Sequence, residues 1–285
     1  MNTLKIALQK SGRLSEKSIR LLLDCGIGLS NGTKSLKAKS DNFPLEILFL
    51  RDDDIPQYVA EGVAHLGIVG SNVVTEKGIS LPQLLQLGFA KCRLSLAIPK
   101  EENYEGIGFF QNKKIATSYP RILKEYLQQK QIECDIEEIS GSVEIATSIG
   151  LAHAVCDIVS TGSTLLQNGL KEVHSIYQSE AVLVSTPSLP AAEQVLANEL
   201  LFRIKAVLAA RQNKYILLNT PNKSIDPICQ LLPGMKSPTI LPLAQPGWSS
   251  LHSVVPENDF WPVISALKDL GAEGILVTSI EKMIA

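Results

Sequence analysis

The sequence predicts an α/β protein with two lobes that share a cleft, followed by a smaller C-terminal module. Short apolar runs alternate with amphipathic segments up to residue 190, which is the pattern of parallel β–α–β units. The apolar runs 92–99 and 181–185 stand where the chain would leave the first lobe and return to it. After residue 213, the order strand, helix, strand, strand, helix, strand indicates a ferredoxin-like βαββαβ module.

The first lobe is predicted over residues 1–95, with residues 179–189 returning to it. A helix is expected after each of its strands, and Ser15 and Gly26 have the residue types of an N-cap and a stop for the first helix. The strands are expected at 4–8, 45–50 and 65–70, and the helices at 16–25, 57–62 and 72–77.

The second lobe is predicted over residues 96–178. Loops that follow the carboxyl ends of parallel strands in both lobes would face the cleft. The strands are expected at 114–117, 134–139 and 152–159, with helices at 120–129 and 142–146 and a brief helix from 165 to 170.

A linker helix is predicted over residues 190–212, because apolar residues recur there at helical spacing. The terminal module, 213–285, resembles small domains that often bind an effector or a partner, although fold alone does not establish which. Its strands are expected at 215–218, 239–243, 251–255 and 274–278, and its helices at 224–232 and 259–270.

Composition and charge restrict the classes of function. The chain has 285 residues, a net charge of −2 and 45% hydrophobic residues, which is ordinary for a globular protein without a broad basic surface. We therefore expect no nucleic-acid partner, and phosphorylated ligands would be held by local cations and backbone N–H groups. The five cysteines are scattered, no apolar run has the length of a membrane span, and the N-terminus enters a strand directly. These features predict a cytoplasmic protein that contacts no membrane.

The stretch 156–170 carries the strongest ligand signal. Asp157 lies near the end of an apolar strand, and the turn Ser160-Thr161-Gly162-Ser163-Thr164 follows before a helix start. Glycine lets the backbone approach a phosphate, the hydroxyls add donors, and Asp157 could take ribose hydroxyls beside that phosphate. The alternative is a plain helix cap, with Ser or Thr as N-cap and nothing bound. The residues of the loop alone leave both interpretations open.

Two charged loops follow strands of the first lobe. In Gln9-Lys10-Ser11-Gly12-Arg13, two cations flank a Ser-Gly turn, which suits a polyphosphate, and the alternative is a solvated loop. In Arg51-Asp52-Asp53-Asp54-Ile55-Pro56, Arg51 could reach a substrate, and one acid could take a hydroxyl, an amine or a water on Mg²⁺. Local sequence favours a capping role for Asp53 or Asp54.

Further polar residues stand at strand ends or inside apolar runs. Arg93 interrupts an apolar strand and needs a partner or a cleft, whereas Cys92 is more typical of a small core residue than of a nucleophile. Ser118 lies in a hydroxyl-rich turn, and Glu144 could complement a helix N-terminus or pair with Asp157 to hold sugar hydroxyls. The sequence shows no metal-ligand spacing, Walker loop or nucleophilic serine motif, and its isolated histidines favour structural or surface roles.

Together these motifs resemble those of the ATP phosphoribosyltransferase family in its long, regulated form. The resemblance covers nearly the whole chain. Each motif alone has only modest specificity for the family, so the resemblance depends on the order and spacing of the motifs. They are QKSGRL at 9–14, RDDDIP at 51–56, LGIVG at 66–70, CRLS at 92–95, IATSYP at 115–120, SGSVE at 140–144, DIVSTGSTL at 157–165, PTILP at 238–242 and IEKM at 280–283.

The resemblance implies a catalytic part built like a type II periplasmic binding protein and an ACT-like regulatory domain that binds histidine as feedback inhibitor. It implies the first reaction of histidine biosynthesis, in which N1 of ATP joins C1 of 5-phosphoribosyl 1-pyrophosphate (PRPP) and pyrophosphate leaves with Mg²⁺ present. It also implies a homo-hexamer in equilibrium with dimers. Because the nucleophile is a substrate nitrogen, positioning and charge stabilisation would carry the catalysis.

The resemblance also assigns residues to ligands, with no protein ligand assigned to Mg²⁺. Catalytic roles fall to Lys10, Arg13 and Asp157. PRPP would be bound by Glu144, Asp157, Ser160, Thr161, Gly162, Ser163 and Thr164. ATP would be bound by Gln9, Lys10, Ser11, Gly12, Arg13, Arg51, Asp52, Arg93 and Ser118, with residues 9–13, Arg51 and Arg93 on the opposite side of the cleft. Histidine would meet Asn219, Thr239 and Ala272, although Asn219 stands where an acid would be a better partner for the amino group.

Two other classes of protein remain open at this point. A two-lobed architecture also serves non-enzymatic solute capture, although the phosphate-type loop and the lack of a secretion signal count against it. Another phosphoribosyltransferase, acting on quinolinate or a free base, would share the loop, whereas the terminal module indicates a regulated enzyme at the entry of a pathway.

Overall fold

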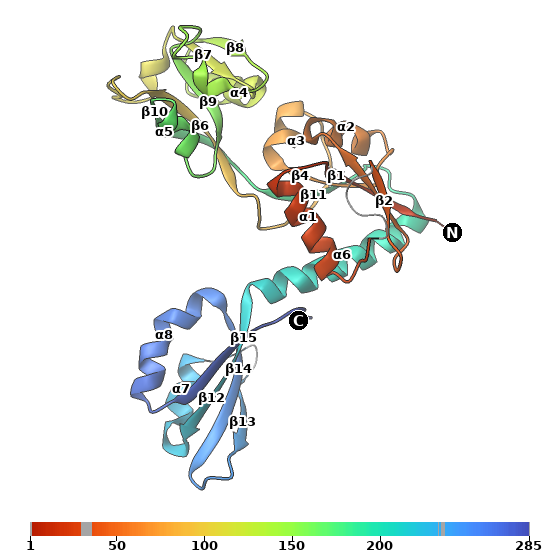
Figure 1. Ribbon diagram of the computed structural model, residues 1–285, viewed down its shortest axis with the longest axis vertical. Helices are drawn as coiled ribbons and strands as arrows, with labels where there is room; N and C mark the ends of the chain where they lie inside the picture. Colours follow the sequence, from red (N-terminus) through yellow and green to blue (C-terminus); the bar gives the residue numbers. More distant parts are fainter. Residues whose placement is uncertain (1, 30–35, 233, 235–236, 285) are drawn as a thin grey trace. The chain divides into compact units, whose positions relative to one another are not determined.

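The computed structural model describes residues 2–29, 36–232, 234 and 237–284 of the chain (Figure 1). The chain forms two compact units, Met1–Ala197 and Asn198–Ala285. The first unit contains two sheets, which define lobe I and lobe II, and the second unit contains one sheet. The boundary between the units falls inside the predicted linker helix.

Lobe I is built on a six-stranded sheet with the order β2-β3-β1-β4-β11-β5. Its central strands β1 (Leu4–Gln9), β3 (Leu45–Leu50) and β4 (Leu66–Gly70) are parallel, so their carboxyl ends lie at one edge. They are buried on both faces, which explains their nearly continuous apolar sequence. β2 (Lys37–Lys39) and β11 (Ala181–Ser185) run antiparallel to these strands, and β5 (Gln83–Gln86) pairs antiparallel with β11. The helices of lobe I are α1 (Arg13–Asp24), α2 (Ile55–Ala60) and α3 (Ser71–Lys77).

Lobe II is built on a five-stranded sheet with the order β10-β6-β9-β7-β8. Its apolar side chains form two cores, one with helix α4 (Pro120–Gln129) and the other with the short helix α5 (Ser163–Gln167). Strand β7 is parallel to β8 and β9, whereas β6 is antiparallel to β9 and β10. The strands are β6 (Cys92–Pro99), β7 (Lys114–Thr117), β8 (Asp135–Glu138), β9 (Ala154–Val159) and β10 (Leu170–Ser179).

Two segments of chain connect the lobes, one before β6 and one between β10 and β11. Where they meet, Leu87 N–H donates to the Ala181 carbonyl and Ala181 N–H donates to the Phe89 carbonyl, both at 2.9 Å. The predicted departure and return of the chain are therefore present. A lobe I carboxylate also contacts lobe II, because Glu76 of α3 accepts the N–H groups at the start of α4.

The second unit has an antiparallel sheet with the order β13-β14-β12-β15. With two helices on one face, this is the predicted ferredoxin-like arrangement, and the helices pack on a core that includes Ile216 and Leu251. Helix α6 (Ala191–Arg211) precedes it, and its elements are β12 (Asn213–Pro221), α7 (Ile225–Leu231), β13 (Thr239–Pro242), β14 (Trp248–Pro256), α8 (Glu257–Asp269) and β15 (Glu273–Ser279).

Some local predictions are wrong. The first helix begins at Arg13, because Gly12 with φ of 92° is its N-cap, and Ser15 is buried inside the helix. The predicted brief helix ends at Gln167, and Leu170 begins strand β10, which the sequence pattern does not predict. Strand β6 lies wholly in the lobe II sheet, so residues 92–95 pair there and not in the first lobe.

Within the described part of the chain, no helix combines the length and apolar character that crossing a membrane requires.

Candidate active site

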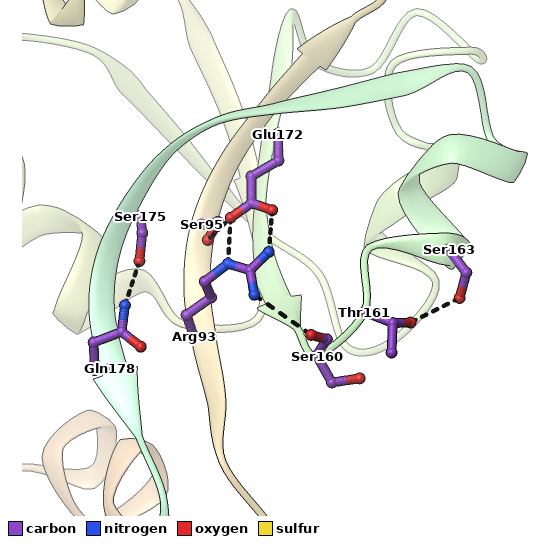
Figure 2. A network of polar contacts seen from close by, with 8 residues as sticks. All are labelled: Arg93, Ser95, Ser160, Thr161, Ser163, Glu172, Ser175 and Gln178. Carbon is purple, nitrogen blue, oxygen red and sulfur yellow. Dashed lines mark hydrogen bonds and ion pairs between the residues drawn. The ribbon is translucent and has the colours of Figure 1, made fainter. Parts of the chain in front are cut away.

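The loop between β9 and α5 presents hydroxyl groups to solvent. Ser160, Thr161, Ser163 and Thr164 are exposed, and Gly162 turns the chain with φ of 80°, in the left-handed region that favours glycine. Gly162 is also the N-cap of α5, and no side chain caps that helix. The alternative prediction, in which a Ser or Thr side chain only caps the helix, requires a hydrogen bond between that side chain and the first turn, and this hydrogen bond is not present. The Thr161 and Ser163 hydroxyl oxygens lie 3.1 Å apart, so the two sides of the turn are linked (Figure 2).

Asp157 and Glu144 lie beside this loop. Asp157 is directly opposite Ser95 in the β9–β6 ladder, and its Oδ1 accepts the Ile158 N–H at 2.7 Å. Burial raises the pKa of Asp157, and the Glu144 carboxylate raises it further. A half-buried carboxylate next to a like charge is stabilised by a ligand that donates hydrogen bonds, such as a pair of sugar hydroxyls.

On lobe I, the loop after β1 lies beside the end of β3. Gln9 pairs with Leu50 in the parallel register, and Lys10 N–H donates to the Leu50 carbonyl at 2.8 Å. Residues 11–13 are exposed, and no atom lies within 4 Å of the position that a Cβ would take at Gly12. The loop therefore has open space at its glycine, next to two basic side chains.

The acidic run after β3 begins with exposed Arg51 and continues as the 3₁₀ helix Asp52–Asp54. Asp54 is the N-cap of α2, but no side chain makes a capping hydrogen bond there. The capping role that local sequence favours is therefore not observed. Burial raises the pKa of Asp52, and the neighbouring Asp53 carboxylate raises it further.

A pocket of about 670 Å³ lies between the two lobes. Lobe I lines it with Asp52, Asp53 and helix α3, and lobe II lines it with residues 118–120 and 138–141. Ser118, a predicted ATP contact, is in this lining, and its hydroxyl donates to the Ile139 carbonyl at 2.6 Å. Carboxylates of lobe I and the hydroxyl-rich turn of lobe II therefore face the same space.

Tyr119 is within the electrostatic reach of acids from both lobes. Burial raises the pKa of its hydroxyl, and the carboxylates of Asp157 and Asp52 raise it further. Asn72 Nδ2 donates to Tyr119 Oη at 3.2 Å, and Ser179 Oγ donates to Asn72 Oδ1 at 2.7 Å. Sequence reasoning singled out the turn that contains Tyr119 but gave Tyr119 itself no role, and it missed Asn72. An amide two residues after an apolar strand is a signal that could have found Asn72.

Arg93 does not lie on the opposite side of the cleft. Its strand β6 belongs to lobe II, and its guanidinium donates to both carboxylate oxygens of Glu172 on β10 (Figure 2). A further N–H donates to the Ser160 carbonyl at 3.4 Å. The predicted position is wrong because the chain has already entered lobe II at residue 92. Sequence reasoning missed Glu172, which is the partner that Arg93 requires.

The predicted effector residues are divided between two places in the second unit. Asn219 of β12 pairs with Glu273, the residue that follows buried Ala272. Thr239 is exposed on β13, which is separated from β12 by β14.

The site residues fit Mg²⁺ that arrives with a substrate. The part of the chain that the structure describes contains no cluster of three or more His, Cys, Asp or Glu side chains arranged to hold a metal ion. Asp52 and Asp157 supply carboxylates whose pKa values are raised by burial and by neighbouring acids, and a cation would relieve that repulsion. Mg²⁺ commonly binds through one or two carboxylates plus substrate phosphates, which this donor set can provide.

The fold and the site define a class of protein. It is a two-lobed α/β enzyme with a phosphate-type loop and paired acids on one lobe, basic loops on the other, and a terminal ferredoxin-like module.

Comparisons with known proteins identify the family. Residues 51–206 match the model of ATP phosphoribosyltransferase (HisG), and residues 210–282 match the HisG C-terminal domain. The ATP phosphoribosyltransferases of Cytophaga hutchinsonii and Phocaeicola vulgatus are 56% and 54% identical to the chain over 281 residues, which is 99% of this chain and 98% and 99% of theirs. The solved ATP phosphoribosyl transferase (HisG:HisZ) complex from Thermotoga maritima gives a TM-score of 0.61 at 30% identity, covering 71% of this chain and 99% of that one.

The chain therefore belongs to the ATP phosphoribosyltransferase family, in the long form that carries a HisG C-terminal regulatory domain. These enzymes perform the first step of histidine biosynthesis. Membership sets aside solute capture and transfer to quinolinate or a free base.

Proposed function

We propose that this enzyme holds PRPP on lobe II and ATP against the loops of lobe I. The observation that carries the proposal is the β9–α5 loop, in which four exposed hydroxyl residues surround the left-handed Gly162 and no side chain caps the helix. Ser160, Thr161, Ser163 and Thr164 would donate to the 5-phosphate, together with backbone N–H groups. Asp157 and Glu144 would accept the ribose hydroxyls.

The lobe I loops would hold ATP and the leaving pyrophosphate. Residues 9–13, Arg51 and Asp52 lie at the carboxyl ends of β1 and β3, where ligands of α/β sheets bind. As the bond from ribose C1 to pyrophosphate lengthens, negative charge grows on the leaving oxygen, and the cations Lys10 and Arg13 stabilise it. The nucleophile is the adenine nitrogen N1, so the protein positions two substrates and needs no side-chain nucleophile.

Mg²⁺ would neutralise part of the charge on the pyrophosphate group when it is bound. Asp52 and Asp157 are the residues that would hold it or its waters, since both carboxylates are half-buried near other acids.

Regulation and assembly belong to the second unit in this proposal. Histidine would bind near Asn219 and Ala272, with Thr239 completing the site, and would inhibit the enzyme. The open face of the sheet exposes Leu241 and Leu276, which supports association of subunits into dimers and a hexamer. The cysteines that the structure describes form no disulfide with one another, which supports a reducing, cytoplasmic location.

The primary experiment measures pyrophosphate release by the purified protein. Release is expected only when ATP, PRPP and Mg²⁺ are all present, and release from PRPP alone would contradict the assignment of ATP as acceptor. Analytical ultracentrifugation with and without histidine tests the proposed dimers and hexamer. A protein that is purely monomeric in both conditions would contradict the proposed assembly.

A second experiment tests the loop. Thr161→Val removes one hydroxyl donor at nearly constant volume, so PRPP should bind about tenfold more weakly, while ATP binding changes little. Thr278→Val is a matched control on an exposed strand of the second unit. Equal PRPP affinity of Thr161→Val and the unaltered enzyme would show that the loop does not hold the phosphate. Arg13→Ala should instead raise the KM for ATP.

A further inference from the structure

The guanidinium of Arg93 is engaged on three sides (Figure 2). Its Nε and one terminal nitrogen each donate to a different oxygen of Glu172 at 2.5 Å, and its other terminal nitrogen donates to the Ser160 carbonyl at 3.4 Å. Glu172 is held in turn by Ser95, whose hydroxyl donates to it at 2.8 Å. A bidentate pair of this kind fixes the plane of the guanidinium as well as its position.

The register of the lobe II sheet explains why these side chains meet. In the β6–β10 ladder Arg93 faces Gln178, Ser95 faces Ser175, and Ala97 faces Glu172. Residues opposite each other in an antiparallel pair share a face, and two bulges in β10 place every third residue on the face of Arg93. Without the bulges, counting from the pair of Gln178 and Arg93, Ser175 would lie on the other face, because alternation has a period of two, and Glu172 would lie opposite Pro99, two residues further from Arg93 along β6.

The contact with Ser160 fixes one peptide of the phosphate loop. In a trans peptide, the C=O and the following N–H point in opposite directions. Because Arg93 holds the Ser160 carbonyl, the Thr161 N–H is directed away from Arg93, and Gly162 then turns the chain with φ of 80°. The tether therefore selects which backbone donor the loop presents outward.

We propose that Arg93 and Glu172 are positioning residues, which orient the Ser160–Thr161 peptide so that the loop is ready for a sugar phosphate. This inference rests on the proposed binding of the PRPP phosphate by the loop. Arg93 thus acts through Ser160 and is not itself a ligand of ATP or PRPP.

The electrostatics of the pair support this role. The Glu172 carboxylate neutralises the charge of Arg93, so the pair attracts a distant polyanion little. An anion that bound Arg93 directly would have to compete with two charge-assisted hydrogen bonds. The hydrogen bond from Arg93 also lowers the pKa of Glu172, so the carboxylate is ionised where the enzyme works.

The two possible roles of Arg93 predict opposite results for Glu172→Gln. If Arg93 were an anion ligand, removing the competing charge would leave PRPP binding equal or tighter. For a positioning pair, the loop loses its tether and PRPP binds about tenfold more weakly, the loss expected for one charge-assisted hydrogen bond. The dissociation constant is measured by calorimetry with Mg²⁺ and without ATP, and ATP affinity is measured in parallel and should stay within about twofold.

A double-mutant cycle measures whether Arg93 and Glu172 act together in PRPP binding. Arg93→Ala, Glu172→Ala and the double variant should weaken PRPP binding to the same extent, since the two residues act as one unit, and additive losses would overturn the proposal. Glu137→Gln breaks a different ion pair of lobe II, with Lys114 at 3.3 Å, and should leave PRPP binding unchanged.

Two further outcomes separate the possible failures. If Glu172→Gln does not fold, Arg93→Lys decides the question, because a lysine still attracts phosphate as a point charge but cannot replace the three-way tether. Affinity retained by Arg93→Lys would then overturn the positioning role. If Thr161→Val leaves PRPP binding intact, the proposed phosphate site itself fails. If Thr161→Val weakens PRPP binding and Glu172→Gln does not, the phosphate site stands and only the positioning role of Arg93 and Glu172 is overturned.

Discussion

Glu76 of lobe I is predicted to stabilise the start of a helix in lobe II. Its two carboxylate oxygens accept the N–H groups of Arg121 at 2.8 Å and Ile122 at 3.0 Å, in the first turn of α4. These N–H groups have no partner within the helix, and the N-cap residue Tyr119 makes no side-chain cap. Glu76 therefore supplies, from another lobe, the cap that the local sequence lacks.

The expected effect of Glu76→Ala follows from these contacts. Loss of a helix cap costs about 1 kcal/mol, and loss of a negative charge at a helix N-terminus costs about 0.3–1 kcal/mol more. We therefore expect a loss of about 1–2 kcal/mol in the free energy of unfolding, which lowers the Tm by about 2–8 °C for a unit of this size. Glu76→Gln keeps one acceptor oxygen and should lose about half as much.

The assay is urea unfolding followed by circular dichroism, with Tm measured in parallel. Glu125→Ala is the matched control, because it removes an exposed ion pair with the same residue, Arg121, at 3.0 Å. Such a pair contributes only about 0.3–0.5 kcal/mol. If Glu76→Ala and Glu125→Ala lose equal stability, the interlobe cap contributes nothing and the reasoning is refuted.

Three other predictions concern the site, the core and the effector. Burial raises the pKa of Asp157 above its ordinary 3.8, so the ionised carboxylate destabilises the folded protein above its folded-state pKa. Asp157→Asn should therefore raise the Tm at pH 8, and this gain in Tm should shrink toward pH 3.8. A gain in Tm that is the same at both pH values would contradict the prediction. Gly67→Ala places a Cβ 2.9 Å from two methyl groups of α2 and should cost about 1–3 kcal/mol in urea unfolding, whereas Gly108→Ala, with open space around it, should cost nothing. Asn219→Asp should tighten histidine binding about tenfold by calorimetry, and unchanged affinity would remove Asn219 from the effector site.

The elements with clear periodicity were predictable from sequence, and the bulged strand was not. The central strands β1, β3 and β4 are nearly all apolar because they are buried on both faces. Strand β10 escaped prediction because its two bulges interrupt the alternation that identifies a strand. Ser15 has the residue type of an N-cap, but Gly12 supplies the turn three residues earlier, so Ser15 is buried in the helix.

The candidate site was predictable where its residues follow strands in sequence. The loops at residues 9–13, 51–54 and 160–164 each lie directly after a strand, so their place at the sheet edge followed from the α/β pattern. Contacts between segments that are distant in sequence could not be predicted from this pattern. Arg93 and Glu172 are 79 residues apart and meet only through the bulged register. The cap that Glu76 provides depends on the placement of one lobe against the other, which no local pattern encodes.

The position of β11 has a consequence for synthesis of the chain. β11 lies between β4 and β5 in the lobe I sheet, yet it follows the whole of lobe II in sequence. Lobe II uses one continuous stretch, from β6 to β10, and has all its strands as soon as Ser179 has emerged from the ribosome. Until residues 181–185 follow, β4 presents an unpaired edge and β5 lacks its only partner strand among the described residues. A nascent chain that pauses within lobe II is therefore exposed to edge-to-edge aggregation through lobe I, the part made first.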